Sequence, residues 1–425
     1  MSEEKHTPNL ATRALCVIGA LFPGGIVTIN AGVKLTVGRI GLLLLLAPAL
    51  AALANSSRRK IAADLWVLVI ALWMIGVAAY AGGSENLSSA GAQALEFSGG
   101  YFVARGLFSD PAGARALVDA LKPILVVVVL LALVDTASGR PFVHETLARL
   151  AGVGPMLTPD FRMNLVRAVA TFDHPILLGS FCTIAGVLFM NAEQTRGGWL
   201  LWVGLSAAGC FLALSSAPML SLVIALALFA YSRATEQQSW RWSLIWFVLT
   251  VSIATIFLVT NHPVGWIISH LTFDPVSGYF RLMIWDRALP MIGDRPITGH
   301  AFALFNDYIL DTTVDSVWLV LGLRYGVPLI VLLVLANVAT MMPTPRPIES
   351  LADRRMATGF SMALFLFMLT GFTVHYWHYL WILWGLCLGV RGSLRADALA
   401  QAASSGVKVF AAPMELTRAV RISAR

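Results

Sequence analysis

Charged residues and cysteines are scarce in this sequence, and no long polar segment is present. Charged side chains make up 12% of the 425 residues and hydrophobic ones 58%, with a mean hydropathy of +0.76. This composition excludes a soluble globular protein of this length. Because no polar stretch suits a second domain and no internal repeat is obvious, we expect one transmembrane domain over residues 1–395 and a cytoplasmic tail over 396–425.

The cysteines and the net charge each exclude a class of function. No CxxC pair occurs, and every cysteine lies inside an apolar run, so we expect neither a disulfide framework nor a metal site. The formal charge of +7 comes from short clusters of Lys and Arg between apolar runs, which argues against nucleic-acid binding. The four cysteines are Cys16, Cys182, Cys210 and Cys387.

Long apolar runs are what the sequence has in abundance. A helix that crosses a bilayer needs roughly 20 apolar residues, because its backbone groups must bond internally. The runs predict an all-α polytopic membrane protein with about 12 transmembrane helices. The fourth has Glu96 and Arg105 within it and Glu85 just before it, so it should face the bundle interior or tilt if it crosses. The expected spans cover 14–30, 33–54, 61–83, 87–108, 114–135, 174–192, 198–214, 217–232, 243–260, 314–340, 357–374 and 376–390.

Lysine and arginine distribution predicts the orientation. The short connections rich in these residues, such as Arg58-Arg59-Lys60, all fall on one side of this arrangement. The positive-inside rule assigns that side, with both termini, to the cytoplasm. Two long loops, about 136–173 and 261–313, then lie on the opposite side, where we expect them to contain short helices.

The two long loops carry arginines against the positive-inside trend. One interpretation is that these side chains pair with loop aspartates and are solvated. The other is an anion site, because the planar, always charged guanidinium binds phosphate through two hydrogen bonds. A lipid-linked diphosphate would be the natural ligand beside a membrane. The arginines are Arg140, Arg149, Arg162 and Arg167 in the first loop, and Arg281, Arg287 and Arg295 in the second.

Two loop segments carry a family resemblance. The first runs from Arg167 through Thr171-Phe172 and His174-Pro175 to Gly179, and the second from Arg281 through Trp285 to Leu289, followed by Pro296-Ile297-Thr298-Gly299-His300-Ala301. Leu214 to Ala217 and Val314 to Leu319 supply supporting context, and the order of these motifs spans residues 160–340. Together they resemble the O-antigen ligase and O-antigen polymerase superfamily of bacterial integral membrane proteins.

Two departures from the family pattern bear on the type of enzyme. Asp315-Ser316 stands where family ligases commonly have a His-Asn pair, and Gly299-His300-Ala301 replaces a Gly-x-Gly sequence. Polymerase-like members tolerate such variation more readily. The resemblance therefore implies a polymerase, with the ligase as the alternative.

What the resemblance implies is a metal-independent glycosyltransferase of cell-envelope polysaccharide assembly. It would polymerise undecaprenyl-diphosphate-linked repeat units at the periplasmic face of the bacterial inner membrane, without a cofactor. Arg167 and Arg281 would bind the diphosphate, with Arg162 and Arg287 as further contacts. Expected partners are the lipid-linked oligosaccharide, the bilayer, and a chain-length regulator or flippase.

Two residues are candidates for the general base. Asp315 ranks first because it occupies the family's histidine position, although a plain helix-capping role is equally expected. His300 ranks second, against a role as an ordinary loop histidine. His174 and Trp285 are expected to line the pocket, and His174 is also interpreted as a structural residue at a helix start.

Two further alternatives remain. His375 and His378, three residues apart, could ligate a metal, but we expect no carboxylate or cysteine to accompany them, so an interfacial placement among aromatic residues is preferred. A different class of protein, a secondary transporter or lipid-linked glycan flippase, would use charges inside spans. The candidate charges are Glu96, Asp119 and Lys122.

Overall fold

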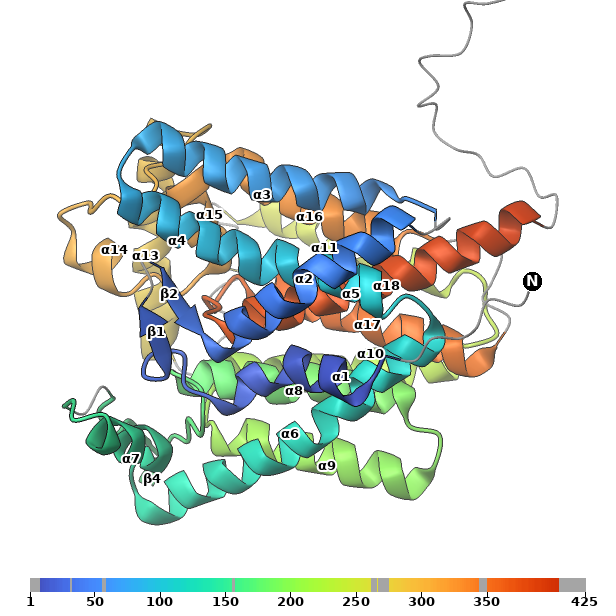
Figure 1. Cartoon of the computed structure of the whole chain (residues 1–425), viewed down its shortest axis with the longest axis horizontal. Helices are drawn as coiled ribbons and strands as arrows, with labels where there is room; N and C mark the ends of the chain where they lie inside the picture. The colour runs from blue at the N-terminus through green and yellow to red at the C-terminus, as the bar shows by residue number, and fades with distance from the viewer. Residues whose placement is uncertain are drawn as a thin grey trace, which may run out of the picture.

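The computed structural model describes residues 8–30, 33–55, 59–154, 157–260, 266, 275–343 and 350–404. The regular secondary structure of this part of the chain is helical apart from two short hairpins, and most of the long helices run roughly along one direction (Figure 1). The helices are α1 (Leu10–Val17), η1 (Ile18–Leu21), α2 (Val37–Asn55), α3 (Ala62–Ala81), α4 (Ser84–Ala94), η2 (Leu95–Gly99), α5 (Gly100–Leu107), α6 (Pro111–Ser138), α7 (Phe142–Leu150), α8 (Pro175–Ala192), α9 (Arg196–Leu212), α10 (Ser216–Ala234), α11 (Arg241–Val259), α13 (Pro275–Asp294), α14 (Tyr308–Thr312), α15 (Val317–Tyr325), α16 (Val327–Met341), α17 (Leu351–Thr370) and α18 (Tyr379–Ser404).

Within the described residues, six helices are long and apolar enough to cross a membrane: α2, α3, α6, α8, α10 and α11. By helix length and hydropathy the chain is therefore a multi-pass membrane protein, as the apolar runs predicted. The predicted count of about 12 spans is not confirmed. Each predicted run does contain helix, but several of these helices are short, broken or interrupted by charge.

Two of the predicted spans show why the count differs. The run at 14–30 ends as helix at Leu21 and continues into a hairpin of β1 (Thr28–Asn30) and β2 (Lys34–Thr36). The run at 314–340 is divided into α15 and α16 at Gly326, which has φ +79°. A Cβ there would lie 2.1 Å from the carbonyl oxygen of Ile297, so only glycine fits this break.

The core is built around α8 and α18. Every residue of α8 is buried, and this helix packs against α9, α10 and α17, whereas α18 packs against α5. The indole of Trp384 on α18 is fully buried, 5.8 Å edge-to-face from Phe97 and stacked 5.3 Å from Phe367 between ring centroids. By contrast, α11 is an apolar helix with almost no buried residue. Its exposed face suits contact with lipid.

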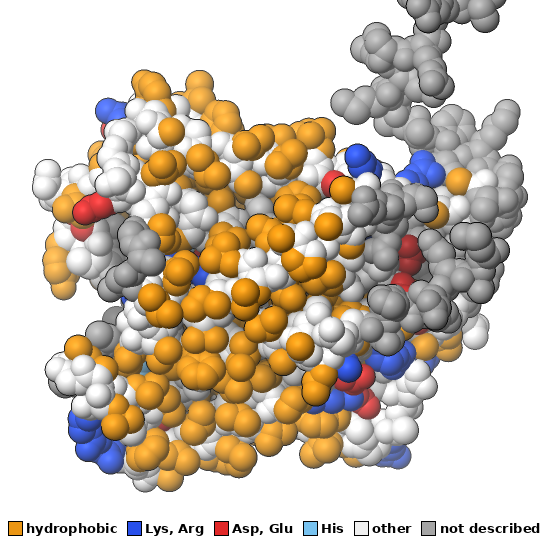
Figure 2. Space-filling model, viewed as in Figure 1, with side chains coloured by type: hydrophobic (Ala, Val, Ile, Leu, Met, Phe, Trp, Pro, Cys, Tyr) orange, Lys and Arg blue, Asp and Glu red, His pale blue; other side chains and the backbone are white. Residues whose placement is uncertain are grey.

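Parts of both predicted long loops gather at one end of the bundle. At the left of Figure 1 lie α7, α13, α14, the β1–β2 hairpin and a second hairpin of β3 (Phe161–Arg162) and β4 (Leu165–Val166), whereas α18 ends on the right. Figure 2 shows hydrophobic side chains over the middle of the visible face and most charged ones toward its two ends. The predicted loops thus contain helices, of which α7 and α14 are short, as expected, whereas α13 has 20 residues. Residues 261–265 and 267–274 of the second loop, and 405–425 of the predicted tail, lie outside the described residues.

Candidate functional site

Arg162 and Arg167 are positioned by the β3–β4 hairpin. Arg162 pairs with Leu165 across a two-residue turn at Met163 and Asn164, which have φ values of +54° and +62°. Such left-handed pairs suit the turns that join antiparallel strands. The Arg162 Nη1 donates a hydrogen bond of 3.1 Å to the carbonyl of Leu214, so the hairpin rests on the α9–α10 turn. Two motifs that are distant in sequence therefore meet here.

Arg167 follows the hairpin and is largely buried. Its Nη1 donates to Asp160 Oδ2 at 2.6 Å, and its Nε donates to the carbonyl of Ala213 at 3.5 Å. Pairing with a loop aspartate, one of the two interpretations of the sequence, thus applies to this arginine. Burial lowers the pKa of Arg167, Arg162 lowers it further, and Asp160 and Asp315 act in the opposite direction. The Asp315 carboxylate is therefore close enough to Arg167 to interact with it electrostatically.

Asp315 lies at the entrance to α15 but does not cap it. The capping residue is the next one, Ser316, whose Oγ accepts from the backbone N–H of Leu319 at 3.5 Å. The expected alternative of Asp315 as a helix cap is therefore wrong, because the neighbouring serine fills that role. Burial raises the pKa of the Asp315 carboxyl, while the positive charges of Arg281 and Arg167 oppose the rise. The carboxylate has both predicted diphosphate ligands as electrostatic neighbours.

Arg281 and Trp285 belong to one face of α13, because they are four residues apart on a helix. The Arg281 side chain is buried, and the Trp285 ring stacks on Phe372 at a centroid distance of 6.0 Å. Phe372 follows Gly371, whose carbonyl accepts from Ser316 Oγ at 3.0 Å. This face of α13 and the start of α15 thus meet the same turn between α17 and α18.

His174 caps the start of α8. Its Nδ1 accepts from the backbone N–H of Ile176 at 3.1 Å, so a neutral ring carries its proton on Nε2. Burial lowers the pKa of His174 to about 4, with Arg167 and Arg281 adding to the effect. The predicted structural role at a helix start therefore agrees with this geometry. We call Arg167, Arg281, Asp315 and His174 the arginine–Asp315 cluster.

Two predicted site residues lie apart from this cluster. His300 Nε2 is 2.8 Å from the carbonyl oxygen of Met291, and its backbone N–H bonds to Leu323 near the far end of α15. That end is about 10 Å along the helix axis from the end beside Asp315. Arg287 forms an ion pair of 2.7 Å with Asp307, and its side chain is about half exposed.

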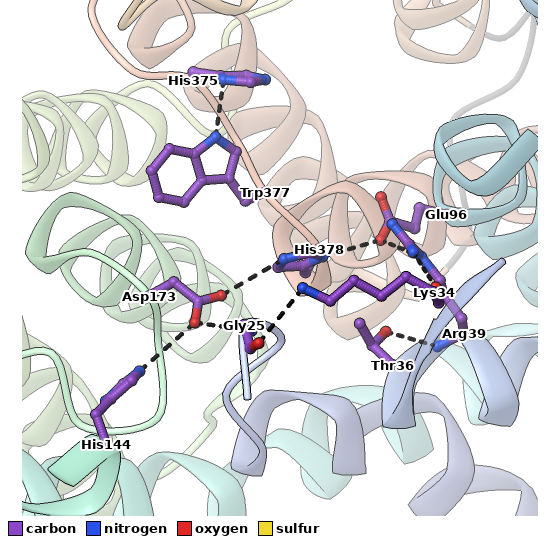
Figure 3. Close-up of polar contacts among 10 residues, drawn as sticks. All are labelled: Gly25, Lys34, Thr36, Arg39, Glu96, His144, Asp173, His375, Trp377 and His378. Atoms are coloured by element: carbon purple, nitrogen blue, oxygen red, sulfur yellow. Dashed lines mark hydrogen bonds and ion pairs between the residues drawn. The ribbon is translucent and has the colours of Figure 1, made fainter. Parts of the chain in front are cut away.

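Sequence reasoning missed a second set of polar contacts, centred on His378 (Figure 3). Its Nδ1 lies 3.6 Å from Glu96 Oε1, and its Nε2 lies 3.7 Å from Asp173 Oδ2. Glu96 accepts a hydrogen bond of 2.9 Å from Arg39 Nε, and Asp173 Oδ1 lies 3.6 Å from His144 Nε2. We call these five residues the His378 cluster. The expectation that no carboxylate accompanies this histidine is wrong, because both come from distant segments.

The segment between η1 and β1 packs against the His378 cluster. The Gly25 N–H donates to Asp173 Oδ1 at 3.1 Å, and Lys34 Nζ donates to the Gly25 carbonyl at 3.4 Å. At Gly24, a Cβ would lie 2.4 Å from His378 Cδ2, so the backbone packs directly on the imidazole. Beside the ring is a cavity of about 20 Å³, large enough for one water molecule.

The charge state of Asp173 reflects these neighbours. Burial acts to raise the pKa of its carboxyl, but His144, His378 and the Gly25 amide together outweigh burial and lower it below the usual value. Asp173 is therefore ionised at neutral pH. It connects the two clusters, because His174 is the next residue and the His174 ring lies 6.1 Å from that of Trp377, beside His378.

The two histidines of the α17–α18 turn have different surroundings. His375 Nδ1 accepts from Trp377 Nε1 at 2.9 Å, in agreement with the expected placement among aromatic residues. Burial lowers the pKa of His375 well below its usual value, and Arg324 and His378 contribute in the same direction. His378, by contrast, faces carboxylates. Figure 3 shows the two rings apart, with contacts to different groups.

No protein-family model matches this sequence, and no curated protein matches it significantly. The resemblance described above thus stays a prediction about family membership. The geometry of the two clusters is independent of it.

Proposed function

We propose that this protein is a membrane glycosyltransferase that polymerises undecaprenyl-diphosphate-linked glycan repeat units at the periplasmic face of a bacterial inner membrane. The observation that supports this proposal is the arginine–Asp315 cluster. Two arginines from separate loops and one carboxylate with a raised pKa are electrostatic neighbours. Transfer from a glycosyl diphosphate requires groups that stabilise the anionic leaving group and a group that accepts the proton of the acceptor hydroxyl.

The proposed reaction assigns one role to each group. The acceptor sugar hydroxyl attacks the anomeric carbon of the donor, and the bond from that carbon to the diphosphate oxygen breaks. Arg167 and Arg281 stabilise the negative charge that develops on the departing lipid diphosphate. The Asp315 carboxylate accepts the hydroxyl proton, for which its raised pKa makes it a stronger base than an ordinary aspartate.

The neutral His174 suits this arrangement. Because its Nδ1 is occupied by the α8 amide, its Nε2–H is left as the donor side of the ring. A neutral donor binds an anionic or hydroxylated ligand without adding a third positive charge beside Arg167 and Arg281. We assign His174 to orienting the ligand and Trp285 to the wall formed by α13.

Purified protein incubated with undecaprenyl-diphosphate-linked repeat units tests the proposal directly. We expect a ladder of lengthened products on a gel, unchanged by a chelator, and no ladder from Arg281→Ala. Arg281→Lys should also be poor, because lysine keeps the charge and loses the planar pair of donors. Arg140→Ala is the control, since Arg140 bonds to Glu145 at 3.0 Å and has no place in the cluster.

The products also separate the alternatives. Transfer of a preformed glycan to a lipid A core acceptor without lengthening would identify a ligase. Consumption of no donor by the folded protein would count against any transferase that uses this donor. A full-length ladder from Arg281→Ala would remove that arginine from the mechanism.

A second candidate function is secondary transport or glycan flipping, and one observation favours it. Glu96 is 2% exposed, in a π-helical turn between α4 and α5, and bonds to the buried Arg39. Ionisable residues inside membrane helices often mark transport paths, and π-turns often occur at functional sites. Ion-gradient-driven substrate uptake into proteoliposomes, without glycan transfer, would support this candidate.

A further inference from the structure

The geometry around His378 has a specific chemical consequence. A neutral imidazole has one N–H donor and one lone pair, so it can satisfy only one of two carboxylates that face its two nitrogens. Here Glu96 faces Nδ1 at 3.6 Å and Asp173 faces Nε2 at 3.7 Å. Only the doubly protonated imidazolium presents a donor and a positive charge to both. The arrangement therefore selects the protonated ring.

The charges that surround the ring balance only when one proton is bound. The buried Arg39 offsets Glu96, to which it bonds at 2.9 Å. The negative charge of Asp173 then remains, shared between the imidazoles of His378 and His144. With both rings neutral, the cluster would hold an uncompensated carboxylate in a mostly buried setting, which is unfavourable.

Other ionisable groups near the ring do not supply that charge. Lys34 of β2 is exposed, and its Nζ donates to the Gly25 carbonyl and not to a carboxylate. His375, on the same turn, accepts from Trp377 on Nδ1, and its pKa is lowered. The buried Tyr379 hydroxyl donates to the carbonyl of Cys16 at 3.3 Å, away from the carboxylates. Of the two imidazoles that face Asp173, only His378 also faces Glu96, so His378 is the group placed to carry the charge.

The backbone holds the ring in this position. His378 has φ +47°, a left-handed conformation that non-glycine residues adopt at a cost, and its carbonyl accepts the N–H of Trp381 at the start of α18. Gly24 packs on the other side of the ring. A strained residue that is fixed from both sides, between two carboxylates, is typical of a site with a function rather than of a loop histidine.

We propose that Asp173, His378 and Glu96 form a proton-binding site, with His378 as the group that carries the proton. The bound proton joins Asp173 and His144, from the first long loop, to Glu96 of η2 and Arg39 of α2. The proposal does not depend on the glycosyl transfer reaction. In a transporter the same proton would be a coupling ion, and in a transferase it would set the pH range of the folded site.

The test measures the protonation of His378 in the intact protein. The full chain, labelled with ¹⁵N at histidine and placed in lipid nanodiscs, is compared by NMR with His378→Gln, which identifies the signal of that ring. We expect both His378 nitrogens to be protonated at about pH 7. In Glu96→Gln and in Asp173→Asn, each of which removes one facing charge, the ratio of protonated to neutral His378 at that pH should fall roughly tenfold.

Glu145→Gln on α7 is the matched control, because Glu145 pairs with Arg140 outside the cluster, and it should leave the His378 signal unchanged. The two test variants are independent, so a failure of one to fold leaves the other as the measurement. A neutral His378 ring at about pH 7 in the wild-type protein would overturn the proposal. An unchanged protonated fraction in the folded carboxylate variants would do the same.

Discussion

Arg167 Nη1 lies 2.6 Å from Asp160 Oδ2, so an arginine proposed to bind the donor diphosphate already holds a carboxylate. The two partners differ in exposure, since the Arg167 side chain is 10% exposed and that of Asp160 is 54% exposed. A diphosphate that reached Arg167 would displace Asp160, which can turn into solvent without moving the arginine. In the proposed mechanism Asp160 would therefore compete with the donor for Arg167.

Asp160→Asn should lower the KM for the lipid-linked donor by roughly two- to fivefold, the range expected for loss of a partly exposed ion pair. The kcat should be unchanged, because the carboxylate has left the arginine before the chemical step. Asp307→Asn, which breaks the similar pair with Arg287 outside the cluster, should leave KM as it was. A higher KM in Asp160→Asn would show instead that Asp160 holds Arg167 in its binding position.

Asp315→Asn should reduce kcat by about 10²- to 10⁴-fold, the range that removal of a general base produces. The KM should change little, because the amide fits the same space and the arginines remain. His300→Gln should stay close to wild type, because His300 bonds to Met291 away from the cluster. Steady-state kinetics on both variants decides the assignment, and the opposite ranking would transfer the base to His300.

The pH profile of kcat tests the same carboxyl. Burial raises the pKa of Asp315, and a protonated carboxyl cannot accept the acceptor proton. Activity should therefore fall as the pH drops through this raised value, which lies above the ordinary aspartate value of about 3.9. Arg281→Gln removes a charge that opposes the rise, so in its residual activity this acidic limb should move to higher pH. Persistence of the same limb in Asp315→Asn would assign it to another group.

Much of the fold was predictable because lipid allows few solutions for the backbone. Each apolar run does contain helix, and the β-branched and leucine-rich segments of α2, α3 and α6 are long enough for a span. Hydropathy alone does not reveal breaks that depend on contacts. Gly326 divides the run at 314–340 because Ile297, from the preceding loop, approaches its Cα too closely for a side chain.

The two clusters were predictable to different degrees. Arg167, Arg281 and Asp315 stand in ordered loop motifs, so their relation could be inferred from sequence. The sequence did not show that Ser316, and not Asp315, caps α15. The His378 cluster unites residues from α2, η2, α7, the α8 entrance and the α18 entrance. The available signal was Glu96 in an apolar run, which indicated a buried partner without saying which one.

Gly24→Ala should destabilise the protein by about 1–3 kcal/mol, the usual effect of added volume in a packed site. The new Cβ would lie 2.4 Å from His378 Cδ2 and push the ring away from Glu96 and Asp173. Gly76→Ala on α3 is the matched control, because nothing lies within 4 Å of a Cβ there and alanine favours helix. Thermal unfolding in detergent measures both, and equal stability of the two variants would contradict the packing described for Gly24.

Substitutions at His174 separate its capping role from its role in the site. His174→Ala removes the acceptor for the Ile176 N–H and should cost about 1 kcal/mol of unfolding free energy, whereas His174→Asn keeps an acceptor and should not. Because the pKa of His174 is about 4 in the folded protein against 6.5 ordinarily, the unfolded chain binds more protons between these values. Wild-type stability should therefore fall as the pH falls through that window, and this component should be absent from His174→Asn. If His174→Asn keeps its stability and still loses transferase activity, the imidazole contacts the ligand. Full transferase activity of His174→Asn would instead restrict His174 to capping α8.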